Sequence, residues 1–484
     1  MPERILFLTG KLAEPRLRKV LESMRPTQFS YEVRNIGLSV AALMTAGMIL
    51  RRVTDINGAG RVIVPGLCRG NLEQASKSLG VPVIRGPDDL KDLPEFFGGT
   101  GRPPDLSRYE VRIFAEIVEA PAITTQAILD RARVYAADGA DVIDIGCLPD
   151  TPFPHLEESI VALKSAGLAV SVDSVEPDEL LRAGRAGADY VLSLSEKTVW
   201  IAEEIGATPI LIPAEHGDME SLYRGIEDLK GKNRRFLADS ILDPIHFGFA
   251  DSIRRYIALR ERCPDIEIMM GLGNLTELTE ADTTGVNAVL FGIISELCIG
   301  NILTTEVSPH ARSAVREADR ARRILFAARE DGRLPKGLDS GLLIGHARKP
   351  FPYSDAEIAE LALEIRDPSY RVQVTETGIH VYNRDGRITG TDPFSFFPKL
   401  ALLAGDAPHA FYMGVELTKA RIAWQLGKRY VQDEELDWGV AVPEQKKGRS
   451  GALHAPAGAE EGYKPAGPTL KASRASKKKK RRKK

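Results

Sequence analysis

Between residues 112 and 324, short apolar runs alternate with amphipathic segments at even spacing, and this repeat constrains the fold more than any other feature of the chain. Short buried strands that alternate with helices are typical of βαβ units in a parallel sheet. Eight such units in roughly 210 residues match a (β/α)8 TIM barrel, whose usual size is about 250 residues. An open doubly wound sheet is the alternative, but the even spacing favours closure. The expected strands are 113–118, 142–145, 169–172, 190–194, 209–212, 235–241, 267–271 and 288–291.

Two further domains are expected to flank the repeat, which makes the chain α/β overall. The first hundred residues combine apolar strands with helical patterns, as in a doubly wound, Rossmann-like α/β domain. Glycines in this part do not form the fingerprint G-x-G-x-x-G, so no nucleotide site is indicated. Alternating strands around the turn at Asn383–Gly386 and a helix at 410–428 predict a small α+β domain. The expected division is 1–100 for the N-terminal domain, 108–330 for the barrel, 345–442 for the C-terminal domain and 443–484 for a disordered tail.

The composition is that of an ordinary globular protein, because 43% of the 484 residues are hydrophobic and 27% are charged. The chain has no apolar run of about 18 residues or more, so no membrane span is expected. Its first residues lack the basic and apolar regions of a secretory signal. Four scattered cysteines without a Cys-x-x-Cys pair argue against a zinc site or a disulfide framework. We therefore expect a cytoplasmic protein without cysteine-based metal ligands.

Positive charge is concentrated at the C-terminus. Ten basic residues and no acidic residue lie between Lys471 and Lys484, so the net charge of −2 leaves −12 on residues 1–470. A nucleic-acid-binding protein normally carries its basic patch on the folded domain. No specific nucleic-acid partner is therefore expected, and the tail is expected to be a solvated segment with few residues to bury.

Acidic residues follow or end several of the predicted strands, namely Glu119, Asp144, Asp173 and Asp243. The catalytic and binding groups of such barrels come from the C-terminal ends of different strands. One such acid alone could be a helix cap or a salt-bridge partner, whereas four at equivalent positions favour a site. A carboxylate can accept two parallel hydrogen bonds from a ring N–H and an adjacent NH₂ group. Pterins and guanine present such an edge.

Two later segments add polar and aromatic groups to this predicted site. In Ile241–Phe249, a proline ends the strand after Asp243, and the loop carries a histidine and two phenylalanines that could stack on a flat ligand or belong to the core. In Met269–Leu275, glycines permit close backbone approach, and Asn274 can both donate and accept hydrogen bonds. His310 is a candidate proton handler or anion contact, or a structural histidine.

These segments resemble the successive signatures of dihydropteroate synthases and other pterin-binding barrels. The resemblance covers residues 120–312 and rests on GADVIDIGCLPDTP, AVSVDS, AGADYVLSLS and ILDPIHFGF, in that order. The whole chain is similar to the dihydropteroate synthase-related proteins of organisms that make tetrahydromethanopterin-type one-carbon carriers. The resemblance implies a cytoplasmic transferase that condenses a 6-hydroxymethyl-dihydropterin diphosphate with an arylamine and releases diphosphate, with Mg²⁺ accompanying the diphosphate.

The same resemblance implies roles for individual residues. The pterin ring would be held by Asp173, Asp243, Asn274, Glu119 and Ser193. His310 would contact the diphosphate or relay a proton, and Asp144 would support the mobile loop that follows its strand. These two residues are the catalytic candidates.

The chain departs from the synthase pattern at the end of the site that would hold the diphosphate. Glu119 stands where synthases carry an asparagine, and the loop at 149–155 lacks their arginine. Gly273-Asn274-Leu275 replaces Ser-Arg-Lys, and Ser308-Pro309-His310 keeps only the histidine of Arg-x-His. Because diphosphate departure needs stabilisation of the developing charge, this end is expected to be remodelled, or completed by another domain, a metal ion or a partner subunit.

Two other functions fit these departures from the synthase sequence pattern. Gly273-Asn274 is closer to the pterin-dependent methyltransferases, in which an asparagine of this loop contacts the pterin ring. The missing cations also fit a non-catalytic pterin-binding or scaffold protein of the same pathway. A homodimer or a complex with a pathway enzyme is compatible with each of these functions.

Overall fold

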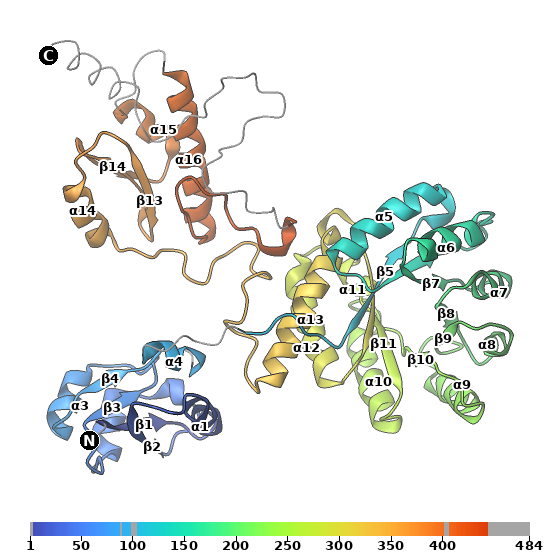
Figure 1. Cartoon of the computed structure of the whole chain (residues 1–484), viewed down its shortest axis with the longest axis horizontal. Coiled ribbons are helices and arrows are strands. Elements are labelled where there is room, and N and C mark those ends of the chain that lie inside the picture. Colours follow the sequence, from blue (N-terminus) through green and yellow to red (C-terminus); the bar gives the residue numbers. More distant parts are fainter. Residues whose placement is uncertain (1–2, 88–89, 98–103, 401–405, 444–484) are drawn as a thin grey trace. The chain divides into compact units, whose positions relative to one another are not determined.

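A computed structural model describes residues 3–87, 90–97, 104–400 and 406–443 of the chain. It forms two compact units, residues 1–109 with 326–338 and residues 110–325 with 339–484. Figure 1 shows three separate sheets along the sequence. The predicted disordered tail lies, from residue 444 onward, outside the described residues. Within the described part, no helix is both long and apolar enough to cross a membrane.

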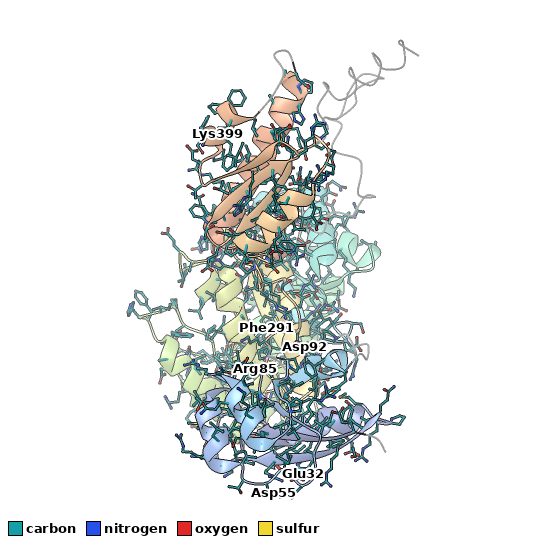
Figure 2. The ribbon with its side chains drawn as sticks, turned by 90° about the vertical axis from the view of Figure 1, so that its left-hand side faces the viewer. Glu32, Asp55, Arg85, Asp92, Phe291 and Lys399 are labelled. Carbon is teal, nitrogen blue, oxygen red and sulfur yellow. The ribbon has the colours of Figure 1, made fainter. Side chains whose placement is uncertain are left out.

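The first unit contains a parallel four-stranded sheet with strand order β2-β1-β3-β4. Successive side chains of β1 point to opposite faces, so Leu6 and Leu8 pack in one apolar cluster and Ile5 and Phe7 in another. Arg85, labelled in Figure 2, donates to the Cys68 and Gly70 carbonyl groups at 2.7 and 2.6 Å and so fixes the loop after β3. The elements are β1 (Glu3–Thr9), α1 (Glu14–Ser23), β2 (Phe29–Asn35), α2 (Ala46–Arg52), β3 (Arg61–Val64), α3 (Leu72–Leu79), β4 (Val83–Arg85) and α4 (Leu93–Phe96).

The second unit contains a closed barrel of eight parallel strands, which confirms the predicted fold class. The strands are β5 (Arg112–Ile117), β6 (Val142–Gly146), β7 (Ala169–Asp173), β8 (Tyr190–Leu194), β9 (Thr208–Leu211), β10 (Leu237–Ala238), β11 (Glu267–Gly271) and β12 (Asn301–Thr305). The helices between and after them are α5 (Thr125–Asp138), α6 (Leu156–Ser165), α7 (Pro177–Ala186), α8 (Ile201–Glu204), α9 (Met219–Gly231), α10 (Phe249–Arg262), α11 (Gly273–Thr276), α12 (Thr283–Glu296) and α13 (Ala314–Glu330).

The predicted last strand, 288–291, is wrong. These residues lie inside α12, and the eighth strand is β12 instead. Leu290 and Phe291 (Figure 2) are buried in the core around the barrel strands. A four-residue apolar run cannot be assigned to a buried strand or a buried helix by its pattern alone. The predicted strand 235–241 is also shorter than expected, because only Leu237–Ala238 pair with their neighbours.

The side chains inside the barrel change from apolar to acidic along the barrel axis. An apolar layer fills the N-terminal part and is made of Phe114, Val142, Tyr190, Leu192, Ile210, Leu237 and Met269. Because side chains alternate along a strand, the next inward positions are two residues further on. These positions are Glu116 in β5, Asp144 in β6 and Asp239 directly after β10. The barrel therefore has an apolar base below an acidic mouth at the C-terminal ends of the strands.

The C-terminal part of the second unit is a three-stranded antiparallel sheet packed with helices. The turn at Asn383–Gly386 joins β14 to β15 as predicted. Helix α14 begins with a capping box, in which the Ser354 hydroxyl and the Glu357 carboxylate each accept from the other's backbone N–H. The elements are α14 (Asp355–Glu364), β13 (Arg371–Thr375), β14 (Gly378–Asn383), β15 (Gly386–Gly390), α15 (Pro393–Phe396) and α16 (Ala407–Leu426).

Candidate functional site

Three carboxylates from neighbouring strands meet at the mouth of the barrel. Glu116 of β5, Asp144 of β6 and Asp173 of β7 each place an oxygen so that all three oxygens lie within 4.8 Å of one another. The strand register causes this, since Glu116 is opposite Asp144, and Asp173 is opposite Gly146. Asp144 is 0% exposed, whereas the other two side chains are partly accessible from the mouth. We call these three residues the carboxylate cluster.

Two hydroxyl groups orient the carboxylate cluster. Ser171 donates to Oδ1 of Asp144, and Ser193 donates to Oδ1 of Asp173 at 2.5 Å. Among the described residues, Oδ2 of Asp144 has no hydrogen-bond partner although it is buried. Ser193 has a φ of +68° and lies where the pairing of β8 with β9 shifts register. A non-glycine residue in this conformation stores strain, and such strain concentrates at functional sites.

The carboxylate cluster concentrates negative charge in a poorly solvated place. Burial, followed by repulsion from Glu116 and Asp173, raises the pKa of Asp144 well above its usual value. Burial and then Asp173 raise the pKa of Glu116 to about 7. Burial also raises the pKa of Asp173, against the lowering effect of the Ser193 hydrogen bond. The arrangement therefore favours a bound proton or another positive charge.

A glycine makes room for the carboxylate cluster. A Cβ atom at position 146 would lie 2.5 Å from Oε1 of Glu116, 3.2 Å from Cα of Val118 and 3.3 Å from the carbonyl oxygen of Ile117. Two of these three contacts are with backbone, which cannot rotate away. Position 146, at the end of β6, is therefore restricted to glycine.

We expect Gly146→Ala to lower the free energy of unfolding by about 1–3 kcal/mol, because overpacking a filled site costs that much. Chemical denaturation would measure it. Gly285→Ala is the matched control, since a Cβ there meets no atom within 4 Å and alanine is the better helix former. Equal stability of the two variants would contradict the expectation.

A second acidic group, Asp239, lies just beyond β10. Its Oδ1 accepts from the Tyr256 hydroxyl at 2.5 Å and from the Ile241 backbone N–H at 2.7 Å. Burial raises its pKa to about 6, and these hydrogen bonds oppose the rise. Asp239 therefore changes protonation in the native state close to neutral pH.

Asp239→Asn should change how stability depends on pH. Because the native pKa of about 6 lies above the value of about 3.9 in an unfolded chain, this aspartate contributes stability below pH ~4 and loses it as the pH rises to ~6. Wild-type stability should fall relative to the variant by on the order of 2 kcal/mol between pH 4 and 7. Urea unfolding of both proteins across this range is the measurement. Parallel pH curves would contradict the assigned pKa.

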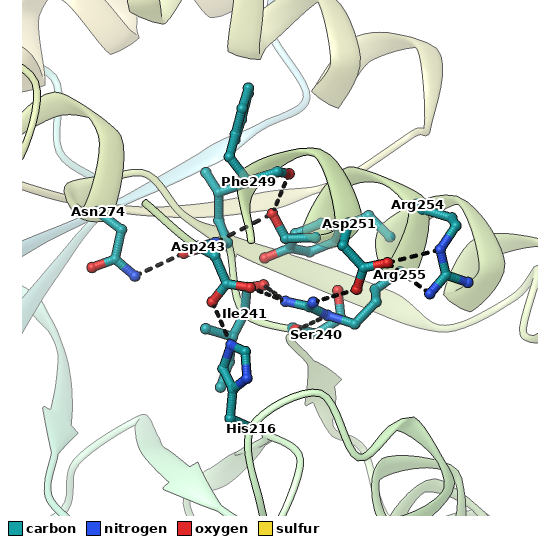
Figure 3. Close-up of polar contacts among 12 residues, drawn as sticks. His216, Ser240, Ile241, Asp243, Phe249, Asp251, Arg254, Arg255 and Asn274 are labelled. Carbon is teal, nitrogen blue, oxygen red and sulfur yellow. Dashed lines mark hydrogen bonds and ion pairs between the residues drawn. The ribbon is translucent and has the colours of Figure 1, made fainter. Parts of the chain in front are cut away.

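Asp243 lies in a different environment, shown in Figure 3. Its carboxylate accepts from Nη2 of Arg255 at 2.7 Å, and its other oxygen is 2.9 Å from Nε2 of His216. Burial raises the pKa of Asp243, but the hydrogen bonds from Arg255 and then His216 outweigh it and leave the pKa below its usual value. A Cβ atom at Gly248, which has a φ of +126°, would lie 2.6 Å from Oδ2. Asp243 is thus an ionised and firmly held carboxylate.

Arg255 connects this carboxylate to the surrounding loop. Its guanidinium, 3% exposed, also donates to the carbonyl groups of Ser240 and Ile241 at 3.2 and 2.8 Å, and to Asp251 at 3.0 Å. The Asn274 amide at the start of α11 donates to the Leu242 carbonyl at 2.7 Å, next to Asp243 in the chain. The Asn274 side chain therefore joins the start of α11 to the segment that follows β10.

The structure brings together some of the predicted site residues and separates others. Asp144, Asp173 and Ser193 lie in or against the carboxylate cluster, and Asn274 lies beside Asp243. Glu119 is exposed and occupies the N-cap position of a short 3-10 helix beyond β5, without a side-chain capping hydrogen bond. His310 is half-buried, with Nε2 3.0 Å from the Thr276 carbonyl oxygen. Among the described residues, neither Glu119 nor His310 shares a hydrogen bond with the carboxylates.

Sequence reasoning missed Glu116, Asp239, Arg255 and His216. Glu116 gave a signal, since it interrupts an apolar strand at a position that shares a face with Phe114. Arg255 lies one turn after Asp251 on α10, which is an ordinary helical ion-pair spacing. The sequence position of His216 gave no signal of a role in the site, because its partner, Asp243, belongs to a different loop. Phe247 is 77% exposed and hence not part of the core.

A pocket of about 130 Å³ opens beside the carboxylate cluster. It lies between the loops that follow β6 and β7, and Asp173 and Ser193 form its inner wall. Its other lining residues are Cys147, Leu148, Pro149, Ser174, Val175 and Glu176. The predicted mobile loop after β6 thus supplies one wall of a pocket that reaches a carboxylate of the cluster.

Known proteins resemble different parts of the chain. A family described as "Family of unknown function (DUF6513)" matches residues 3–88. An uncharacterized protein of Methanocaldococcus jannaschii is 25% identical over 525 aligned residues, which cover 90% of this chain and 99% of that protein.

Solved structures that are similar to this chain include dihydropteroate synthases. The Yersinia pestis enzyme with a pterine-sulfa conjugate is 17% identical, with a TM-score of 0.37, and the match covers 47% of this chain and 96% of that one. The Xanthomonas albilineans enzyme in complex with 7,8-dihydropteroate is 19% identical, with a TM-score of 0.37, and covers 46% and 95%. The match thus spans nearly all of each synthase and about half of this chain.

Proposed function

We propose that the barrel binds a pterin at its mouth and transfers it from a 6-hydroxymethyl-dihydropterin diphosphate to an arylamine. The observation that supports this most directly is Asp243, a buried carboxylate that Arg255 and His216 keep ionised and fixed. Such a carboxylate can accept the paired ring N–H and exocyclic NH₂ groups of a pterin. Asp173, oriented by Ser193, is a second acceptor at the same end of the barrel.

In the proposed reaction, the amine nitrogen attacks the methylene carbon attached to C6 of the pterin. A C–N bond forms, the C–O bond to diphosphate breaks, and the ammonium group of the product loses a proton to solvent or to an acceptor in the site. Asp243 and Asp173 bind and orient the ring, and the barrel base excludes water from its inner edge. Mg²⁺, where bound, would neutralise charge on the departing diphosphate.

The direct test is diphosphate release by the full chain supplied with the pterin diphosphate, a series of arylamines and Mg²⁺. We expect release with at least one arylamine. Asp243→Asn should weaken pterin binding about 10- to 100-fold, because charge-assisted hydrogen bonds are worth about 1.5–3 kcal/mol each. Asp228→Asn is a matched control, since among the described residues the Asp228 carboxylate bonds to Lys232 alone, on the surface of α9. No release with any arylamine would refute the synthase reaction.

A methyltransferase is the second candidate, and the Asn274 contact favours it. The segment 271–277 carries no lysine or arginine, and the amide of Asn274 donates to the Leu242 carbonyl, next to Asp243 in the chain. This loop is suited to a neutral pterin edge rather than to a diphosphate. A methylated reduced pterin as substrate, with Asn274→Ala abolishing methyl transfer but not binding, would favour this candidate. Tight pterin binding without turnover in either assay would identify a non-catalytic binding protein.

A further inference from the structure

We infer that Glu116, Asp144 and Asp173 form a binding site for a divalent cation, Mg²⁺ or Mn²⁺, with ligands that come from the chain itself. The inference goes beyond the proposed function, in which Mg²⁺ accompanies the diphosphate of the substrate. Hard divalent cations prefer carboxylate oxygens, and three carboxylates leave further positions for water or a substrate.

The spacing of the oxygens suits one ion. Mg²⁺ binds oxygen at about 2.0–2.1 Å, so oxygens that share an ion lie roughly 3–4 Å apart. The three oxygens of the carboxylate cluster lie within 4.8 Å of one another, so a small adjustment of the side chains is enough for them to share one ion. All three ligands lie on adjacent strands of a closed barrel, which holds them more rigidly than loops would.

An independent observation is the orphaned oxygen of Asp144. This side chain is 0% exposed, and among the described residues its Oδ2 has no hydrogen-bond partner. Oδ1 accepts from Ser171 on β7, and Glu116 is the register partner of Asp144 on β5. Leaving a buried polar atom unpaired costs about 1–3 kcal/mol, and more for a charged group. A cation among the three carboxylates satisfies that oxygen.

The charge balance of the mouth supports the same conclusion. Asp243 forms an ion pair with Arg255 and a hydrogen bond with His216. In contrast, no lysine, arginine or histidine in the described part of the chain forms an ion pair with any residue of the carboxylate cluster. Buried carboxylates are usually paired or coordinate a metal ion. The cluster can be reached, because Asp173 lines the pocket beside it.

The test is Mn²⁺ binding by the full chain without pterin, measured by electron paramagnetic resonance and by calorimetry. We expect one ion per chain and a rise in the melting temperature. Glu116→Gln and Asp144→Asn should each weaken binding by at least about 10- to 100-fold, the loss typical of removing a group that supports a metal ligand. Circular dichroism without metal would establish that both variants are folded.

Glu119→Gln is the matched control, because Glu119 is the exposed glutamate on the same segment and lies outside the cluster. Asp243→Asn should weaken pterin binding and leave Mn²⁺ binding intact, so failure of this inference is distinguishable from failure of the proposed function. Absence of Mn²⁺ binding by the wild type, or equal binding by the folded Glu116→Gln variant, would overturn the inference. An ion lost with Glu119→Gln instead would also overturn it.

Discussion

Arg255→Met should lower the free energy of unfolding by about 3–5 kcal/mol and abolish pterin binding. Removing one partner of a buried ion pair leaves the other charge uncompensated, which costs about that much. Here Arg255 and Asp243 are 3% and 5% exposed, and the carbonyl groups of Ser240 and Ile241 also lose a donor. Loss of Arg255 removes the main interaction that lowers the pKa of Asp243, so this pKa rises and the carboxylate is no longer held in place. Chemical denaturation and calorimetric titration with a pterin measure the two effects.

The neighbouring arginine provides the control. Arg254 pairs with Asp251 but its side chain is 71% exposed, so Arg254→Met should cost at most about 1 kcal/mol. Adding Asp243→Asn to Arg255→Met should restore part of the lost stability, because the unpaired charge is then gone. Equal destabilisation by the Arg254 and Arg255 variants would show that burial of the pair is not the cause.

Arg322→Met is expected to have a similarly large effect on stability, from the opposite end of the barrel. Its guanidinium is 1% exposed and donates to the carbonyl groups of Val111 and Gly139 at 2.6 and 2.9 Å. It also binds Asp141 and Asp319. These bonds join α13 to the segments that lead into β5 and β6. We expect a loss of about 3–5 kcal/mol in chemical denaturation.

Two comparisons distinguish the loss of stability in Arg322→Met from that in Arg255→Met. Arg323→Met removes a 24% exposed partner of Asp319 and should cost much less. Because Arg322 lies at the base of the barrel, the folded Arg322→Met variant should bind a pterin with wild-type affinity. A loss of affinity in folded protein would mean that the base and the mouth are coupled.

The barrel could be predicted from the sequence because its units repeat. Seven of the eight expected strands overlap the observed ones, since buried strands and amphipathic helices differ in length and period. The eighth was misplaced because the apolar run inside α12 imitates a strand, while Asn301–Thr305 is too polar to be recognised. The expected division into four parts stays a prediction.

Site residues could be predicted from the sequence only where they lie at the ends of strands. Asp144 and Asp173 could be grouped because neighbouring parallel strands end at one edge. Glu116 lies within its strand, where its shared face with Phe114 is a weak signal, and only the register to Asp144 distinguishes it from Glu119. The contacts of Asp243 could not be foreseen, because His216 and Arg255 approach it from separate segments that only the closed barrel brings together.

The apolar layer at the base of the barrel restricts how ligands reach the mouth. Phe114, Val142 and their neighbours close one end, so ligands enter and leave through the other. Asp144 lies one inward position deeper than Asp173 along the strands, as the pairing of Asp144 with Ser171 shows. On the two proposals taken together, an ion held at Asp144 would lie deeper than a ring bound at Asp173. The ion would then bind before the ring and leave after it.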